Sequence, residues 1–495
     1  MTYLFNKNVN VLNANAIVQT TNPLPVTITN TPDITGNVTG NVAITNIPDI
    51  TGNVAITNVP DVTGNVEIKN DSGNPIPVSK DSNVNSFTNP IYVAGAFNAS
   101  FYDRSQLDAF GRLRISNPVT LFDSFHRYED NEKFATAVNG AGSAANFNAN
   151  QGLVDLTIGT TSGHYVYRET KRVFAYQPGK SLLVFTTFVM NPPKANLRQR
   201  VGYYGTQNGF YVELNGSTLS FVGRSYVTGS VVNTSVAQAN WNLDKLDGTG
   251  RSGVTLDISK AQILVLDMEW LGAGTFRMGF VIDGQIIYCH AFHHANIIAS
   301  TYITTACLPL RLEIENTGAT ASNSTLKQIC STVISEGGYE IRGRPRTIGT
   351  LPNTAINLPT AGTYHPVVSI RLKANTADCI VTPTNYSVLG VDTGNYSYRL
   401  VRDATINGGT WVPMANSNIE YNITGTSMTG GIPLESGFFA STNQSTGSVP
   451  TQQDSFRYQL ERDSFTSTYY TFTLAVAPNA NGDDVLAALD WQEIT

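Results

Sequence analysis

The sequence predicts an almost all-β protein, with a thin N-terminal repeat followed by two antiparallel β-sandwich domains of jelly-roll or lectin-like type. Of its 495 residues, 41% are apolar and 10% aromatic, which is enough material for two or three packed cores. Only 14% are charged, while Gly, Asn, Thr and Ser are abundant, and this balance favours strands and turns over helices. The third observation is a twelve-residue repeat ahead of the core-forming regions.

Composition also excludes several classes of function. The net charge of −6 gives no basic surface, so we expect no nucleic-acid partner, which would need clustered Lys and Arg against phosphates. No apolar run approaches the roughly 18 residues that span a bilayer. The first residues, Met1–Phe5, do not begin a secretory segment. We therefore expect synthesis in a bacterial cytoplasm and no membrane insertion, with reduced cysteines in the cores that match no metal-binding spacing: Cys289, Cys307, Cys330 and Cys379.

The N-terminal part of the chain is repetitive. Residues 6–86 contain no aromatic side chain, so this stretch cannot bury enough apolar area to fold as a lone globule. Ile44–Ala55 recurs as Ile56–Glu67, and each copy offers a short β-branched strand, a Pro-Asp turn and a Gly-Asn turn. A single copy would leave its Ile and Val side chains uncovered. Several chains wound about a common axis would cover them, and three close most simply, so we expect a homotrimer.

These features divide the N-terminal region into three segments. Residues 1–25 form the expected virion attachment segment, residues 26–85 a β-repeat shaft, and residues 86–118 a connector. A disordered linker is the alternative interpretation of residues 26–85. The periodic β-branched positions and the sparse Asp and Lys argue against it.

The first sandwich domain is expected over residues 119–343. Gln262–Trp270 reads as a buried strand, and Leu308–Ile314 alternates apolar with other residues as a further strand. Phe276–Tyr288 contains two β-rich runs on either side of Asp283-Gly284, the pair that a type I′ hairpin turn demands. These strands form the expected core of the domain.

The second sandwich domain is expected over residues 344–495, after a linker around residues 337–345. Turn signals lie at residues 407–409 and 429–431. The expected strands are His365–Lys373, Phe456–Leu460 and Tyr469–Val476.

Three long sequence motifs resemble those of a known group of proteins. They are DAFGRLRISNPVTLFDS from Asp108, WNLDKLDGTGRSGVTLD from Trp241 and EWLGAGTFRMGFVIDG from Glu269. Together they resemble virion structural proteins of tailed bacteriophages, especially cyanophage tail-fibre or head-fibre proteins, over residues 108–344. The resemblance implies a homotrimeric fibre or spike. It leaves open whether the fibre stands on the tail, the baseplate or the capsid.

Two glycine motifs suggest phosphate binding but lack its context. Gly248–Gly253 matches G-x-G-x-x-G, yet no strand precedes it and a β pattern, not a helix, follows. Gly179-Lys180-Ser181 lacks the earlier glycine of a phosphate loop, that position being Phe174. We expect both to be turns, and we assign no cofactor-binding residue.

The acids Asp267 and Glu269 alternate with apolar residues on one expected strand. Two carboxylates about 5 Å apart on one face serve some sandwich-fold glycosidases as acid and nucleophile. That group's usual third acid is missing, since Val265 and Leu271 continue the face. We therefore expect structural carboxylates and no catalytic residue, with a glycan depolymerase as the alternative.

The run Cys289–His294 could supply metal ligands. On a strand, His290 and His294 would share one face and Cys289 and His293 the other, so a cation would need ligands from another strand or subunit. We expect packed or hydrogen-bonded histidines and no metal, although a cation among His290, His293 and His294 stays open. The sequence therefore indicates a non-enzymatic virion component that contributes to assembly and adhesion to host-surface glycan or protein. A lectin is the alternative within the binding class.

Overall fold

The computed structural model describes residues 117–340, 342–374, 376, 378–442 and 458–494. It also describes two short strands, β1 (Val26–Thr27) and β2 (Val42–Ala43), which pair in parallel. The expected attachment segment, almost all of the shaft and the connector up to residue 116 lie outside the described residues. Of the two units into which the chain divides, residues 1–80 and 81–495, the second contains all the other elements.

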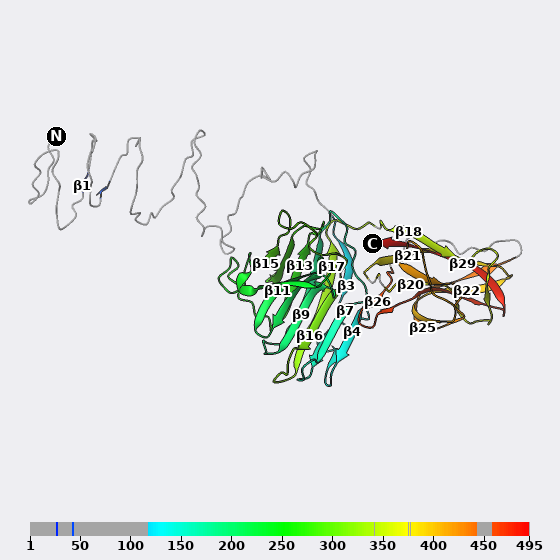
Figure 1. Cartoon of the computed structure of the whole chain (residues 1–495), viewed down its shortest axis with the longest axis horizontal. Coiled ribbons are helices and arrows are strands. Elements are labelled where there is room, and N and C mark those ends of the chain that lie inside the picture. Colours follow the sequence, from blue (N-terminus) through cyan, green and yellow to red (C-terminus); the bar gives the residue numbers. More distant parts are fainter. Residues whose placement is uncertain are drawn as a thin grey trace, which may run out of the picture. The chain divides into compact units, whose positions relative to one another are not determined.

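The first sandwich consists of two sheets, here called sheet 1 and sheet 2 (Figure 1). The seven strands of sheet 1 are, in spatial order, β12 (Val232–Ala237), β11 (Thr218–Ser225), β10 (Gly209–Asn215), β9 (Leu197–Tyr204), β16 (Leu310–Asn316), β7 (Tyr165–Thr170) and β4 (Phe134–Asn139). Sheet 2 has the order β15 (Gln285–Phe292), β14 (Phe276–Ile282), β13 (Gln262–Met268), β8 (Leu182–Val189), β17 (Ser324–Ser335), β6 (Leu153–Ile158) and β5 (Ala144–Asn148), and β3 (Val119–Ser124) also pairs with β17. Every pair of neighbours in these two sheets is antiparallel.

The core of this sandwich lies between the two sheets, because alternate residues of each strand point inward. On β16 the side chains of Leu310, Leu312 and Ile314 join the core, and on β13 those of Leu264 and Leu266 do the same. The residues between them face away from the core. One continuous core therefore runs from β3 to β17, and the all-β, sandwich-type prediction is confirmed for this region.

The expected hairpin is present, and two strand boundaries differ from expectation. Ile282 pairs with Gln285, and Asp283 and Gly284 have φ values of 51° and 75°, as a type I′ turn requires. Strand β13 ends at Met268 because the chain turns back there, with Leu271 at a φ of 42°. Strand β16 begins and ends two residues later than the expected Leu308–Ile314.

The second sandwich is built from two further sheets. Sheet 3 contains β18 (Arg344–Gly349), β29 (Asp483–Ile494) and β19 (Ile356–Leu358), and β21 (Ile380–Gly390) pairs with the other edge of β29. Sheet 4 has the order β23 (Val412–Pro413), β24 (Ile419–Asn422), β20 (His365–Leu372), β28 (Phe472–Pro478), β22 (Gly394–Asn407) and β25 (Ser427–Ser441). A short hairpin, β26 (Arg462–Asp463) with β27 (Thr468–Tyr469), completes it. Its own core includes the fully buried Trp491.

Three expectations for this domain need correction. Residues 458–460 are not a strand, and the expected strand at 469–476 is two separate strands, β27 and β28. The Gly430-Gly431 pair lies inside β25 instead of ending a strand. Both glycines have positive φ, 68° and 86°, within this continuous strand. The bulge of β25 lies a few residues later, at Leu434, because Leu400 pairs with Glu435 and Val401 with Pro433.

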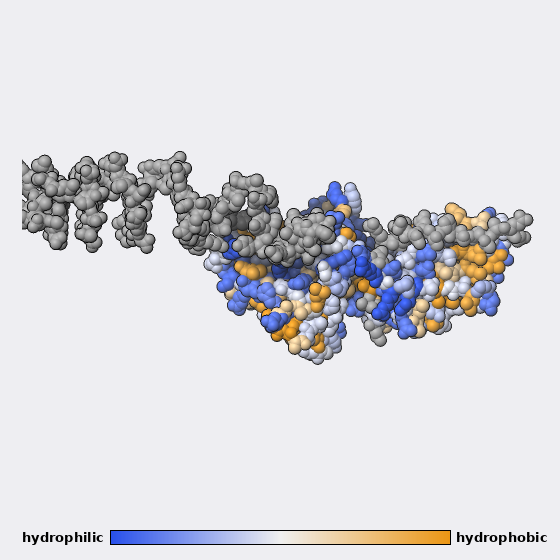
Figure 2. All heavy atoms as spheres, turned by 90° about the horizontal axis from the view of Figure 1, so that it is seen from above, coloured by the Kyte–Doolittle hydropathy of each residue, from blue (hydrophilic) through white to orange (hydrophobic). Residues whose placement is uncertain are grey.

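Helical structure is almost absent from the described ranges. It is limited there to one 3-10 turn at Gln238–Asn240, and no described helix is long and apolar enough to cross a membrane. Apolar residues also reach the visible surface of the sandwiches between hydrophilic ones (Figure 2). On β25 these include Phe438, which is 87% exposed.

Candidate functional site

Asp267 is bound within sheet 2. Its buried carboxylate forms an ion pair with Arg277 on the neighbouring strand β14 and accepts a 2.8 Å hydrogen bond from the Tyr288 hydroxyl on β15. Arg277 also lies over the Tyr288 ring, 4.7 Å from its centroid. Both interactions are made by Oδ2 of Asp267, so the charge of this carboxylate is balanced by Arg277 within the sheet.

Glu269 does not share the strand with Asp267. It follows the end of β13, its side chain is exposed, and its carboxylate accepts a 3.1 Å hydrogen bond from the Thr275 backbone. The expectation that both acids alternate on one strand is therefore wrong for Glu269. The tight turn that closes between Trp270 and Gly274 takes it out of the sheet.

The three histidines lie in different surroundings. His290 accepts a 3.3 Å bond from the Asn242 backbone, while His294 donates from Nδ1 to the Gly274 carbonyl at 2.7 Å and stacks on Tyr302. His293 is exposed. The expected alternation fails because Cys289 is an extra residue in the β14–β15 register and β15 ends at Phe292. No group of three or more His, Cys, Asp or Glu among the described residues is placed to hold a metal ion.

Of the four cysteines, which are free thiols, Cys289 and Cys379 are buried as expected. Cys307 is half-buried, and Cys330 on β17 is exposed. The expectation of a core position is therefore wrong for Cys330.

The two glycine motifs are turns, as predicted. In the first, the carboxylate of Asp244 accepts hydrogen bonds from the backbone N–H groups of Leu246 at 2.9 Å and Ser252 at 2.8 Å. A Cβ on Gly250 would lie 2.2 Å from the Asp244 Oδ1, so the loop closes tightly over its own carboxylate. In the second, Lys180 N–H donates to the Gln177 carbonyl at 3.1 Å.

Sheet 1 carries a layer of charged and aromatic side chains on the face turned away from the core. Glu313 on β16 lies directly opposite Tyr167 on β7 and Arg200 on β9, and Arg200 lies opposite Glu213 on β10. Arg200 bridges the two acids, with Nε 2.6 Å from Glu213 and Nη1 3.0 Å from Glu313. Three adjacent strands are thus linked by one guanidinium.

Arginine and tyrosine alternate across this face. The Arg311 guanidinium lies 5.5 Å from the ring centroid of Tyr167 and 5.9 Å from that of Tyr204. Arg224 lies 5.5 Å from the Tyr204 ring and 5.1 Å from the Tyr211 ring. We call the set the arginine–tyrosine layer: Tyr167, Arg200, Tyr204, Tyr211, Arg224 and Arg311. Such cation–π contacts gain strength when the groups are desolvated, and every member of this layer except the half-buried Tyr167 is buried.

Glu313, which lies among the side chains of this layer, is held as an anion. Burial alone would raise the pKa of Glu313, but the attraction of Arg311 and Arg200 outweighs it and leaves the pKa below its usual value. Glu315, two residues along the same face, is paired with Arg198 and accepts from the Tyr167 hydroxyl. A glycosidase pair needs one carboxylic acid with a raised pKa. Glu313 and Glu315 are instead both ion-paired with arginines.

The second sandwich contacts the first beside this layer. Arg462 lies 3.3 Å from the Glu169 carboxylate, and its backbone N–H donates to the Lys171 carbonyl at 2.8 Å. Gln459 donates from its side chain to the Val173 carbonyl at 2.9 Å. The chain before β26 is therefore bonded to the segment that follows β7.

A second group of charges lies at the same junction. Arg402 on β22 lies 3.1 Å from Glu461 and 3.2 Å from Asp403, and it also pairs with Glu132 of the first sandwich. Burial raises the pKa of both Glu461 and Asp403, which the neighbouring Arg402 opposes.

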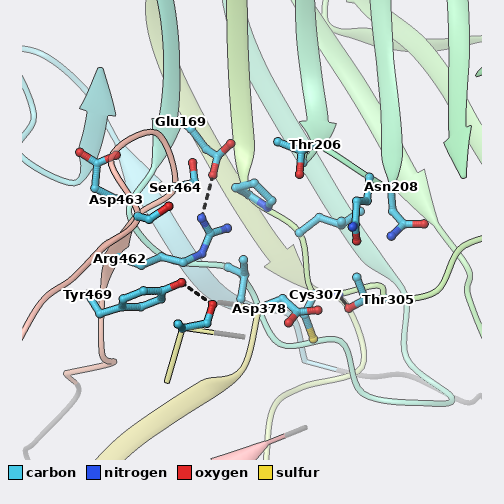
Figure 3. A pocket seen from close by; sticks show the side chains of 17 residues that line it. Glu169, Thr206, Asn208, Thr305, Cys307, Asp378, Arg462, Asp463, Ser464 and Tyr469 are labelled. Atoms are coloured by element: carbon cyan, nitrogen blue, oxygen red, sulfur yellow. Dashed lines mark hydrogen bonds and ion pairs between the residues drawn. The ribbon is translucent and has the colours of Figure 1, made fainter. Parts of the chain in front are cut away.

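A cavity of about 320 Å³, here called the junction pocket, opens between these segments (Figure 3). Arg462 reaches from β26 toward Glu169, and Thr206 and Asn208, from the turn after β9, line another side (Figure 3). Its walls are Glu169, Val173, Gly205, Thr206, Gln207, Asn208, Thr305, Cys307, Leu308, Pro309, Ala374, Asp378, Arg462, Asp463, Ser464, Ser467 and Tyr469.

Neither the layer nor the pocket was identified from sequence. The layer had a local signal, because Leu310–Asn316 alternates apolar residues with Arg and Glu, and this marks a polar outer face as well as a core face. The pocket had none, because its walls come from segments up to 300 residues apart in the chain.

No family model and no curated protein matches the sequence. Solved structures similar to part of the chain include arcelin-5, a lectin-like defence protein from Phaseolus vulgaris, at 10% identity, covering 45% of this chain and 99% of that one with a TM-score of 0.28. A legume lectin-like domain from Entamoeba histolytica matches at 12% identity, 42% and 95% coverage and a TM-score of 0.26. A Bacillus licheniformis β-glucanase matches at 11% identity, 43% and 96% coverage and a TM-score of 0.27. At these scores the similarities do not support any assignment of function.

Proposed function

We propose that this chain is a structural component of a tailed-bacteriophage virion. It would form a homotrimeric fibre or spike that attaches through its N-terminal segment to the tail, baseplate or capsid. The two sandwiches would contribute to assembly and to host-surface adhesion. The observation that carries the proposal is the twelve-residue repeat Ile44–Glu67, placed ahead of two β-sandwiches, and the resemblance over residues 108–344 supports it.

The repeat supports a trimer for a physical reason. Its β-branched residues recur every twelve positions with no aromatic side chain to build a core, so they need other copies of the chain as partners. The proposed protein is made in the host cytoplasm and resides in the virion. Its net charge of −6 is in keeping with protein partners and with the absence of a nucleic-acid role.

The described carboxylates support a non-enzymatic role. Asp267 is paired with Arg277, and Glu313 is paired with both Arg200 and Arg311. An ion-paired, hydrogen-bonded acid is stabilised in its charged form, which suits a structural anion better than a proton donor.

The oligomeric state tests the proposal directly. Sedimentation of the purified full chain should give three times the 53.5 kDa of one chain. Replacing Ile44, Ile56 and Ile68 together with Asp should dissociate the trimer, because a buried charge without a partner is strongly unfavourable. The two sandwiches should stay folded on their own cores.

A matched control places the same charges at polar positions of the repeat. Asn46→Asp, Asn58→Asp and Asn70→Asp together should leave the mass unchanged. A folded wild-type monomer, or an Ile-to-Asp variant that assembles normally, would contradict the shaft. An antibody against residues after Arg344 should label fibres on intact particles, and purified particles without the protein would refute the virion assignment.

A further inference from the structure

The junction pocket contains buried polar groups that the described chain does not satisfy. Arg462 is only 8% exposed, and while it contacts Glu169, its buried Nε–H has no partner among the described residues. The buried hydroxyl of Ser464 is in the same situation. Buried donors and acceptors in folded proteins nearly always have partners, so a water or a bound ligand in this cavity would complete the bonding of both groups.

The rim of the pocket adds free acceptors and donors. The Asp378 carboxylate and the Gln207 side chain are exposed and form no hydrogen bond with any described residue. The Thr206 hydroxyl beside them is exposed in the same way. A ligand at this position can both donate and accept hydrogen bonds. A hydroxyl group does both.

The charge of the pocket selects against an anionic ligand. Glu169, Asp378 and Asp463 contribute three negative charges, whereas Arg462 and the adjoining Arg311, which pairs with Glu169, contribute two positive charges. A phosphate, sulfate or carboxylate would be repelled by this excess. A metal ion is not favoured either, because no three described His, Cys, Asp or Glu side chains converge. Neutral ligands with several hydroxyl groups remain.

Size and shape agree with a sugar ring. The volume of about 320 Å³ lies at the small end of the range for ligand pockets. Tyr469 lines one wall, and its hydroxyl donates to the Ala374 carbonyl at 2.5 Å, which holds the ring in place. A pyranose presents an apolar C–H face that packs on an aromatic ring and hydroxyl groups around its edge.

We infer that the junction pocket binds one neutral pyranose unit of a polysaccharide. Sugar hydroxyls donate to Asp378 and Gln207 and accept from the Arg462 Nε–H. The inference of sugar binding depends on the pocket alone. The assignment of the polysaccharide to a host surface rests on the proposed function. Because the walls come from both sandwiches, neither sandwich supplies the site by itself.

The test uses the full-length protein and simple probes. Methyl glycosides of glucose, galactose, mannose and N-acetylglucosamine are titrated by calorimetry and by saturation-transfer NMR. Glucuronate and calcium chloride serve as the anionic and cationic comparisons. We expect at least one methyl glycoside to bind with a dissociation constant of about 1 mM or below.

Two variants and one control locate the binding. In Gly205→Leu the new Cβ would meet only Pro309 carbons, at 3.7 and 4.0 Å, so the side chain fills the pocket without backbone strain or loss of charge. Asp378→Ala removes the free acceptor. Each should weaken binding by about tenfold or more. Glu129→Gln, at an exposed carboxylate outside the pocket, should change nothing.

Three results would overturn the inference: no glycoside bound by the wild type, equal binding by wild type and both pocket variants, or binding of glucuronate or calcium alone. The outcome is separable from the fibre proposal. A monomeric protein that binds a glycoside in this pocket would uphold the site and refute the fibre, and a trimer that binds none would do the reverse.

Discussion

Replacing Arg200 by methionine removes the central cation of the arginine–tyrosine layer and keeps a long, unbranched side chain. Arg200 is 9% exposed and contacts Glu213 at 2.6 Å and Glu313 at 3.0 Å. Methionine would still pack on the Tyr211 ring, which now lies 5.4 Å from the guanidinium. The change therefore isolates the charge.

The expected loss in the free energy of unfolding depends on the contacts that Glu213 and Glu313 keep after the substitution. Removing one partner of a buried ion pair costs about 3–5 kcal/mol, because the other charge stays buried. Glu313 keeps Arg311 at 2.6 Å, so we expect the lower end, about 3 kcal/mol. For a domain of about 200 residues, each kcal/mol lowers the melting temperature by about 2–4 °C, which gives about 6–12 °C.

Calorimetry of the full-length protein at pH 7 measures this loss, and hydrogen exchange of β9 and β16 amides assigns the transition to the first sandwich. Arg198→Met is the matched control, on the same strand and the same face. Its side chain is 29% exposed, against 10% for Arg200, and its partner is Glu315. Because the Arg198–Glu315 pair is more accessible to water than the pairs of Arg200, its loss should cost less.

The gap between wild type and Arg200→Met should also narrow as the pH falls. The wild type holds the pKa of Glu313 below its usual value, so its advantage is present above the unfolded pKa and is lost as the pH falls through the folded one. Equal melting temperatures for Arg200→Met and wild type would refute the reasoning. So would equal losses in Arg200→Met and Arg198→Met.

Three further outcomes are expected. Wild type, Asp267→Asn and Glu269→Gln should all release no reducing ends from host polysaccharide, and activity that vanished in either variant would establish a depolymerase instead. Stability should fall between pH 6.5 and about 4, because burial lowers the pKa of His126 and His290 to about 4 and only the unfolded chain gains those protons. The slope is at most about 1.4 kcal/mol per pH unit for each histidine, and a flat denaturation midpoint over this range would contradict it. Cys330 should react with a thiol reagent before the other cysteines under native conditions, which mass spectrometry of labelled peptides would show.

The sequence was sufficient where the signal is local. The Asp283-Gly284 turn was predictable because only a few residue pairs tolerate two positive φ values. The alternation of Leu308–Ile314 predicted a strand, which the structure places at Leu310–Asn316. The end of β13 before Glu269 was not predictable from the sequence, because a turn with positive φ at Leu271 has no strong sequence signature. Of the strand expected at Phe456–Leu460, the described residues 458–460 are not in a strand, and Gln459 instead bonds the Val173 carbonyl.

The candidate site shows the limit of sequence more clearly. Arg462 and Glu169 lie almost 300 residues apart in the chain, so no local stretch of sequence indicates their contact. The partners of Asp267, Arg277 and Tyr288, were not predictable from the sequence, because their contacts depend on the register of β13, β14 and β15.

The irregular stretch of β25 from Gly430 to Leu434 has a consequence for the protein at high concentration. This fifteen-residue strand lies at the edge of sheet 4, and its partner among the described strands is β22. Phe438 on this strand is largely exposed. A long, straight edge with apolar side chains is a template for uncontrolled strand addition. Gly430 and Gly431 interrupt the regular spacing of its N–H and C=O groups, so an incoming strand can pair with only part of the edge. The irregular stretch therefore limits strand addition along this edge.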